Sequence, residues 1–260
     1  MGKHDTALLK PIDKTVQCNR DTGFLKLIAI VTMLIDHLGA RVFPQLRIMR
    51  YVGRLAFPIF AYCIALGCCY TRDIRKYALR VLGLAILVQP LYTTAMGHQL
   101  MGAFDWAHDF YRVDLLIRHY YFVHPCILFS LFLGIVLIGT LQRRWYIASA
   151  AVFAVIWYVQ PYLDYNIYGI ILMVLFWALI DRPVSLAVCV GMYMAWYGIP
   201  ALRGRFQPWN IDRINTQFFA ICALPLICIP TNTKIKIPKV VFYAFYPAHL
   251  LLIYLLTMPR

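Results

Sequence analysis

The sequence is poor in charged residues, which make up 14% of its 260 residues, and poorer still in acids, with 11 Asp and Glu against 25 Lys and Arg. Hydrophobic residues reach 62%, well above the roughly 45 to 50% of an ordinary soluble domain. The composition therefore excludes an ordinary soluble protein and predicts an integral membrane protein. The basic residues lie in connections between apolar segments, where membrane topology and lipid headgroups account for them. We expect membrane lipids as partners and no nucleic acid.

Three other features are missing from the sequence. Its eight cysteines form no CxxC pair and no Cys/His spacing typical of zinc, so we expect no metal. Residues 1–23 lack the apolar core and small-residue cleavage site of a secretory signal, so we expect the first apolar segment to remain in the protein. No internal repeat is visible, which argues against a transporter built from two similar halves.

Apolar runs predict the fold class. About 20 apolar residues cross a bilayer as a helix, and runs of ~16 to 17 are tolerated. The runs predict an all-α, polytopic integral membrane helical bundle of about nine transmembrane helices, with eight to ten allowed by the short turns between them. We expect one transmembrane domain at 24–260 after a polar segment at 1–23. The predicted helices are 24–43, 55–70, 77–95, 122–140, 145–160, 166–180, 184–199, 216–230 and 240–257.

The distribution of Lys and Arg in the loops favours a cytoplasmic N-terminus. This orientation leaves a basic cluster, which includes Arg50 and Arg54, on the outer side directly after the first helix. The topology rule does not require a cluster there. The long loop at 96–121 contains acids and histidines, but their spacings match no zinc pattern. We expect an interfacial belt or a lid over a cavity in this loop.

Two ionisable residues lie deep in the first predicted helix, in the stretch LIAIVTMLIDHLGA. Burying such residues costs a few kcal/mol, so Asp36 and His37 should face the bundle interior. Neighbouring helix residues point about 100° apart, so each needs its own partner. Arg54 is the preferred partner of Asp36.

A second histidine lies at similar depth in the last helix. His249 follows Pro247, which removes a backbone hydrogen bond and can open the helix. Together His37 and His249 predict a shared polar cavity. A structural polar clasp, an enzyme with a histidine base and a proton-coupled transporter all fit these residues.

Three segments resemble the TraX family, named for the conjugative-plasmid protein that acetylates the N-terminus of F pilin. They are FLKLIAIVTMLIDHLGA at 24–40, VGRLAFPIFAYCIALG at 52–67 and VVFYAFYPAHLLLIYLL at 240–256. A weaker match is YNIYGIILMVLF at 165–176. The family is in turn similar to multi-pass acyltransferases that use acyl-coenzyme A. The resemblance implies a bacterial inner-membrane protein in conjugation or pilin acetylation.

The resemblance also implies roles for the polar residues. The family's Asp-His pair falls on Asp36 and His37, its Gly-Arg on Gly53 and Arg54, and its late histidine on His249. We expect His37 to be the general base in transfer of an acetyl group from acetyl-coenzyme A, with Arg54 or a protonated His249 donating to the oxyanion. The acceptor would be an amine or hydroxyl of a peptide, such as a pilin N-terminus, or of a small molecule. The alternative functions are a proton-coupled transporter or a non-catalytic membrane component of pilus or secretion assembly.

The donor would need contacts to the phosphates and thioester of coenzyme A. Arg80 is one candidate, because it lies a few residues inside an apolar helix. Arg50 and the Tyr168 hydroxyl are the other two cofactor-binding residues that we expect. The sequence alone does not indicate an oligomeric state.

Overall fold

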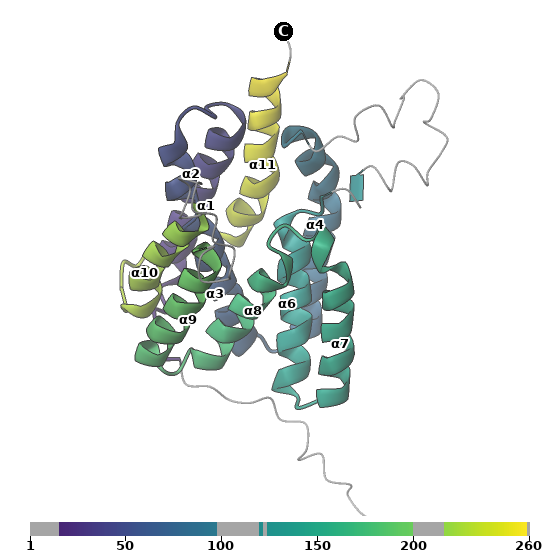
Figure 1. Cartoon of the computed structure of the whole chain (residues 1–260), viewed down its shortest axis with the longest axis vertical. Coiled ribbons are helices and arrows are strands. Elements are labelled where there is room, and N and C mark those ends of the chain that lie inside the picture. Colours follow the sequence, from purple (N-terminus) through teal and green to yellow (C-terminus); the bar gives the residue numbers. More distant parts are fainter. Residues whose placement is uncertain (1–15, 98–119, 122–123, 200–215, 259–260) are drawn as a thin grey trace, which may run out of the picture.

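The computed structural model describes residues 16–97, 120–121, 124–199 and 216–258, and the elements in these ranges are helices joined by short connections. Figure 1 shows the bundle, in which α1, α2 and α11 lie together while α6 and α7 lie on the other side. The helices are α1 (Thr22–Arg41), α2 (Arg47–Gly53), α3 (Ala56–Tyr70), α4 (Ile74–Ala95), α6 (Ile127–Gln142), α7 (Tyr146–Val159), η3 (Gln160–Tyr162), α8 (Asn166–Leu179), α9 (Pro183–Gly198), η5 (Thr216–Ala223), α10 (Leu224–Cys228) and α11 (Lys239–Thr257).

The lengths of these helices bear on membrane crossing. Within the described ranges, four helical segments are long and apolar enough to cross a membrane: Thr22–Arg41, Arg47–Tyr70, Ile74–Ala95 and Val240–Thr257. The second of these comprises α2 and α3 together with the turn between them. Each of the nine apolar runs coincides with helical structure, so the all-α membrane bundle is confirmed in its class. The other crossings expected from the sequence depend on shorter apolar helices of 10–17 residues.

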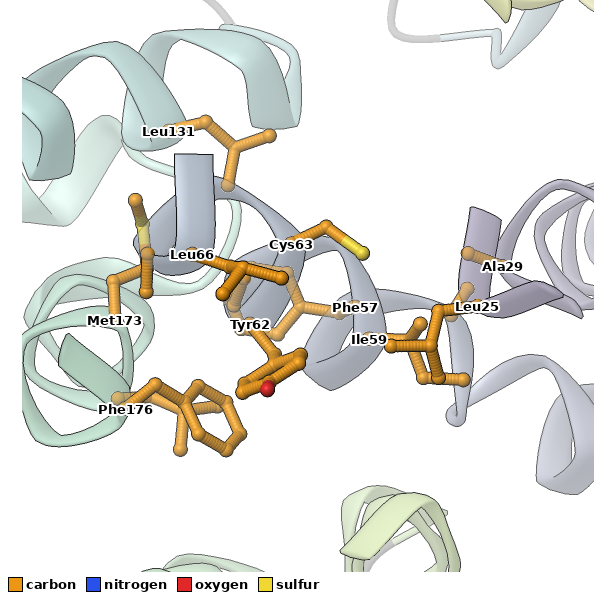
Figure 2. Close-up of a cluster of buried hydrophobic side chains, with 14 of the residues drawn as sticks. Leu25, Ala29, Phe57, Ile59, Tyr62, Cys63, Leu66, Leu131, Met173 and Phe176 are labelled. Carbon is orange, nitrogen blue, oxygen red and sulfur yellow. The ribbon is translucent and has the colours of Figure 1, made fainter. Parts of the chain in front are cut away.

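The central helix of the bundle is α3. Figure 2 shows Tyr62 and Leu66 of α3 between Leu25 of α1 on one side and Met173 and Phe176 of α8 on the other. All five side chains are almost fully buried. Because lipid tails are as apolar as these side chains, close packing rather than water exclusion holds such helices together inside a bilayer. The packing fixes α1, which carries Asp36 and His37, against the rest of the bundle.

Residues 16–21, which the sequence analysis grouped with the polar N-terminal segment, pack against the helical bundle. The backbone N–H of Gln17 donates to the Ile180 carbonyl at 3.1 Å. Asn19 is fully buried, and its Nδ2 donates to the Leu226 carbonyl at 2.8 Å. The Tyr62 hydroxyl donates to the Asn19 carbonyl at 2.6 Å. Residues 1–15 of the expected polar segment lie outside the described residues.

The break between α2 and α3 positions Arg54. Pro58 lies in the first turn of α3, where it lacks an N–H and its ring excludes the carbonyl four residues earlier, that of Arg54. A continuous helix is therefore disfavoured at this point, and Arg54 and Leu55 form a turn. The turn leaves the Arg54 side chain directed toward α1.

Candidate active site

Asp36 joins α1 to the α2–α3 turn. Arg54 Nη2 donates to both Asp36 carboxylate oxygens, at 2.6 and 2.7 Å. Arg50 Nη1 donates to Asp36 Oδ2 at 2.7 Å and to the Asp36 carbonyl at 3.1 Å. The preferred Asp36–Arg54 pair is confirmed, and Arg50 pairs with the same carboxylate.

Gly53 makes this arrangement sterically accessible. A Cβ added to Gly53 would overlap the side chain of Asp36, so only glycine lets α2 approach α1 this closely. The approach places the carboxylate within reach of both arginines. In the Gly-Arg pair of the sequence motif, Gly53 therefore allows the close approach of α2 to α1, and Arg54 supplies the positive charge that pairs with Asp36.

His37 has a different partner, as its direction on the helix predicted. Its Nδ1 lies 2.9 Å from Nε2 of His249, and the two rings stack with centroids 5.1 Å apart and an interplanar angle of 17°. His249 Nδ1 lies 3.0 Å from the carbonyl oxygen of Phe245. The first and last long helices therefore meet through their histidines.

These contacts determine where the protons are when both rings are neutral. A carbonyl can only accept, so His249 Nδ1 donates its proton to Phe245. His249 Nε2 then carries a lone pair and accepts the proton on His37 Nδ1. His37 Nε2 is therefore left unprotonated, which is the state that a general base requires.

A cavity of about 750 Å³ runs beside these residues. Asp36, His37 and Arg54 line one part of it, and Lys26 and Arg80 line another. Lys26 precedes His37 by eleven positions on α1, which corresponds to a separation of roughly 16 Å along the helix. The cavity thus connects a basic region near the starts of α1 and α4 with the histidine and ion-pair region.

The two histidines differ in their exposure to this cavity. His37 lines it, whereas His249 is 3% exposed and lies behind His37. Both ring nitrogens of His249 are already engaged. This arrangement does not favour the expected donation from a protonated His249 to an oxyanion, because both of its ring nitrogens already have partners.

Arg50 and Arg80 line the cavity as expected, but Tyr168 does not. The Tyr168 ring instead contacts Trp196 and Tyr197, with centroids 5.6 and 4.7 Å away. It lines a smaller pocket of about 30 Å³. The structure therefore gives no support to the cofactor contact expected of Tyr168, because its side chain does not line the large cavity.

Tyr165 occupies the cavity wall where Tyr168 was expected. Its ring stacks on Phe57 with a centroid distance of 3.9 Å, and Arg54 Nη1 lies 3.5 Å from its hydroxyl. Asp164, the residue before it, also lines the cavity. Sequence reasoning missed both residues, since the turn that carries them follows a short helix and was read only as a connection. The signal in the sequence was a carboxylate in a turn between two apolar helices.

Among the residues that the structure describes, no three His, Cys, Asp or Glu side chains come close enough together to hold an ion. The histidines and acids of the long loop between 98 and 119 lie outside those residues.

Comparison with known proteins identifies the family. Residues 21–257 match the family described as TraX protein. The chain belongs to the TraX family. This TraX chain is also 47% identical over 38 residues to an uncharacterized protein of Rickettsia prowazekii (strain Madrid E), which is 15% of each protein. It is 30% identical over 86 residues to the probable fimbrial assembly protein FimC, serogroup H1, of Dichelobacter nodosus, which is 31% of this chain and 35% of that protein.

The TraX match covers both ends of the candidate site. It begins before α1 and ends with α11, so it includes both histidines and the ion-pair cluster. The two curated relatives are each matched over about a third of their length or less. No solved structure matches the chain.

Proposed function

We propose that this TraX-family protein is a membrane-embedded acyltransferase that moves an acetyl group from acetyl-coenzyme A to an amine or hydroxyl. The family is associated with pilin acetylation, and one relative bears the name of a fimbrial assembly protein. The observation that carries the proposal is the hydrogen-bond chain from Phe245 through His249 to His37. It supports His37 Nε2 as a free base in the wall of a large cavity.

The proposed base step follows from this chain. As the acceptor nitrogen or oxygen attacks the thioester carbonyl, His37 Nε2 takes its proton. The His37 imidazolium keeps its Nδ1 hydrogen bond to His249, which holds the ring in position. When the tetrahedral intermediate collapses, the C–S bond breaks and the thiolate receives the proton from His37 Nε2. Direct transfer of this kind needs no acyl-enzyme.

The oxyanion of the intermediate needs a donor other than His249. Arg54 is well placed, because its Nη2 is fixed by Asp36 while its Nη1 faces the Tyr165 hydroxyl in the cavity wall. Charge-assisted donors fixed before the reaction are effective in a site shielded from water. We assign oxyanion stabilisation to Arg54 and the orientation of Arg54 to Asp36.

The lining of the cavity offers contacts for both ends of the donor. Lys26 and Arg80 supply two positive charges for phosphates at the end away from His37, and both side chains are long enough to adapt to them. The pantetheine arm would extend along the cavity and bring the thioester to His37. Arg50 pairs with Asp36 at the other end, so it would act on the thioester region rather than on the phosphates. A cytoplasmic N-terminus in the bacterial inner membrane would place the phosphates toward the cytosol.

Calorimetric titration with coenzyme A and acetyl-coenzyme A, combined with an assay of thiol release, tests the proposal. We expect wild type and His37→Ala to bind both ligands and wild type alone to release thiol. Binding by His37→Ala shows that the variant is folded, so its lack of turnover then places His37 in the chemistry. Absence of binding to either protein would refute the acyltransferase.

The histidine pair also fits a proton-coupled transporter, because two imidazoles in contact can pass a proton. The same purified protein distinguishes the two functions. In liposomes, a transporter would move protons in a way that depends on the pH gradient and not on acetyl-coenzyme A. We favour the acyltransferase because His249 does not line the cavity, so a proton path would end at a buried carbonyl.

A further inference from the structure

Two connections meet at one end of the bundle, the one between α3 and α4 and the one between α6 and α7. Gln142, the last residue of α6, donates from Nε2 to the Cys68 carbonyl of α3 at 3.0 Å. A Cβ added to Gly139 of α6 would lie 3.1 Å from Cδ1 of Ile74, the first residue of α4. Figure 1 shows the α6–α7 connection at one end of the bundle. The side chains of both connections therefore share one surface.

This surface has a concentration of positive charge. Its basic patch consists of Arg72, Arg75, Lys76, Arg143 and Arg144. The acid within these two connections is Asp73, whose Oδ1 already accepts the backbone N–H groups of Arg75 and Lys76 at 3.0 and 3.1 Å. Among the residues that the structure describes, none of the four arginines of the patch forms an ion pair. The protein therefore leaves most of this charge for a partner.

Arg144 occupies a position that favours glycine. Its φ of 57° lies in the left-handed region. Its N–H donates to the Leu141 carbonyl at 3.0 Å, and the N–H of Trp145 donates to the Thr140 carbonyl at 3.0 Å, which is a common way for a helix to end. A residue with a Cβ pays for this conformation in free energy. The positive-inside rule requires cations on one side of the membrane, but it does not require an arginine in this backbone conformation.

The residues after the patch are suited to the boundary between headgroups and hydrocarbon. Trp145, Tyr146 and Ile147 are exposed, as is Tyr70 at the end of α3. The guanidinium of Arg143 lies over the Trp145 ring, 5.1 Å from its centroid. Trp and Tyr gather at the headgroup level of membrane proteins. A lipid whose headgroup contacts the patch would therefore lay its acyl chains against exposed apolar side chains.

We infer that the basic patch binds the headgroup of an anionic phospholipid of the surrounding leaflet. The planar guanidinium matches the geometry of a phosphate, and cations near the membrane surface attract anionic lipids. A zwitterionic lipid also carries a phosphate, but the patch repels its ammonium group. None of the five patch residues lines the large cavity. The lipid site is thus independent of the proposed acyltransferase.

The test measures which lipid lies next to Trp145. The purified protein is reconstituted into phosphatidylcholine vesicles in which a fixed small share of the lipid has brominated acyl chains, either as phosphatidylglycerol or as phosphatidylcholine. Bromine quenches a tryptophan that it contacts, and each protein is compared with the same protein carrying Trp145→Phe to isolate the signal of Trp145. We expect brominated phosphatidylglycerol to be enriched about fivefold or more over brominated phosphatidylcholine, the effect of one cation near the surface.

Two triple variants separate a specific site from the general positive charge of the chain. The first removes Arg72, Arg143 and Arg144 by substitution with Gln, and we expect it to lose the preference for phosphatidylglycerol. The second is a control of equal charge, in which Gln replaces three exposed cations outside the patch, Arg182, Lys234 and Lys236. We expect this control to keep the preference.

Arg144→Gly tests the inference without endangering the fold. Glycine relieves the left-handed conformation, so this variant should be at least as stable as wild type to SDS while its preference for phosphatidylglycerol falls. Three results would overturn the inference: equal quenching by the two lipids in wild type, an unchanged preference in the first triple variant, or equal losses in both triple variants. A stable Arg144→Gly protein with the full preference would remove Arg144 from the site.

Discussion

The position of Asp36 between two arginines predicts unequal contributions to stability. The Arg54 and Asp36 side chains are only 8% and 13% exposed, whereas that of Arg50 is 34% exposed. Asp36→Asn leaves two guanidinium groups close together without their carboxylate, and removing one partner of a buried pair costs roughly 3 to 5 kcal/mol. Arg54→Gln leaves Asp36 still paired with Arg50 at 2.7 Å. We therefore expect Arg54→Gln to lower the free energy of unfolding by about the value of a charged hydrogen bond, about 1.5 to 3 kcal/mol.

Unfolding of the detergent-purified protein by SDS, followed by tryptophan fluorescence, measures both losses. We expect Asp36→Asn to be the more destabilising of the two single substitutions. In the double variant the loss should be smaller than the sum of the single losses, because Arg54 no longer lacks a partner once it is replaced. Additive losses, or a larger loss for Arg54→Gln than for Asp36→Asn, would refute this description of the cluster.

Three further predictions follow from the geometry. Free imidazole should restore thiol release to His37→Ala but not to His249→Ala, because only His37 lines the cavity; equal rescue would contradict the assigned roles. Gly53→Ala should lower the unfolding free energy by about 1 to 3 kcal/mol through overlap with the ion-pair carboxylate, whereas Gly83→Ala, whose added Cβ meets nothing within 4 Å, should be neutral or stabilising. Backbone N–H donation lowers the pKa of Asp21, so its stabilising effect is complete above the usual carboxyl pKa and is lost as pH falls below it; wild type and Asp21→Asn should therefore differ less in stability at pH 3 than at pH 7.

The sequence predicted those parts of the site that depend on local geometry. Asp36 and His37 are adjacent on a helix, so separate partners followed from the angle between them, and the structure confirms this. Arg54 was assigned to Asp36 because the chain returns to the bundle directly after α1. The apolar runs likewise located the helices, since apolar composition alone marks a helix that can lie in lipid.

The missing parts depend on the rotation and register of helices that are distant in sequence. Tyr165 and Tyr168 lie three positions apart at the start of α8, and periodicity alone does not say which faces the cavity. The packing of α8 against α3, through Phe57 and Tyr165, decides this. The direct contact between His37 and His249 also depends on how far α11 is shifted along α1. Helix composition does not contain that information.

The hydrogen bond between the two histidines joins positions 212 residues apart, and the contact between Asn19 and the Leu226 carbonyl spans 207. A ribosome must therefore synthesise almost the whole chain before either contact can form. Until α11 is inserted, His37 has no partner to orient its ring, and the cavity lacks one wall. Under the proposed function, a nascent or truncated chain would therefore lack the active arrangement of His37 until the last helix is in place.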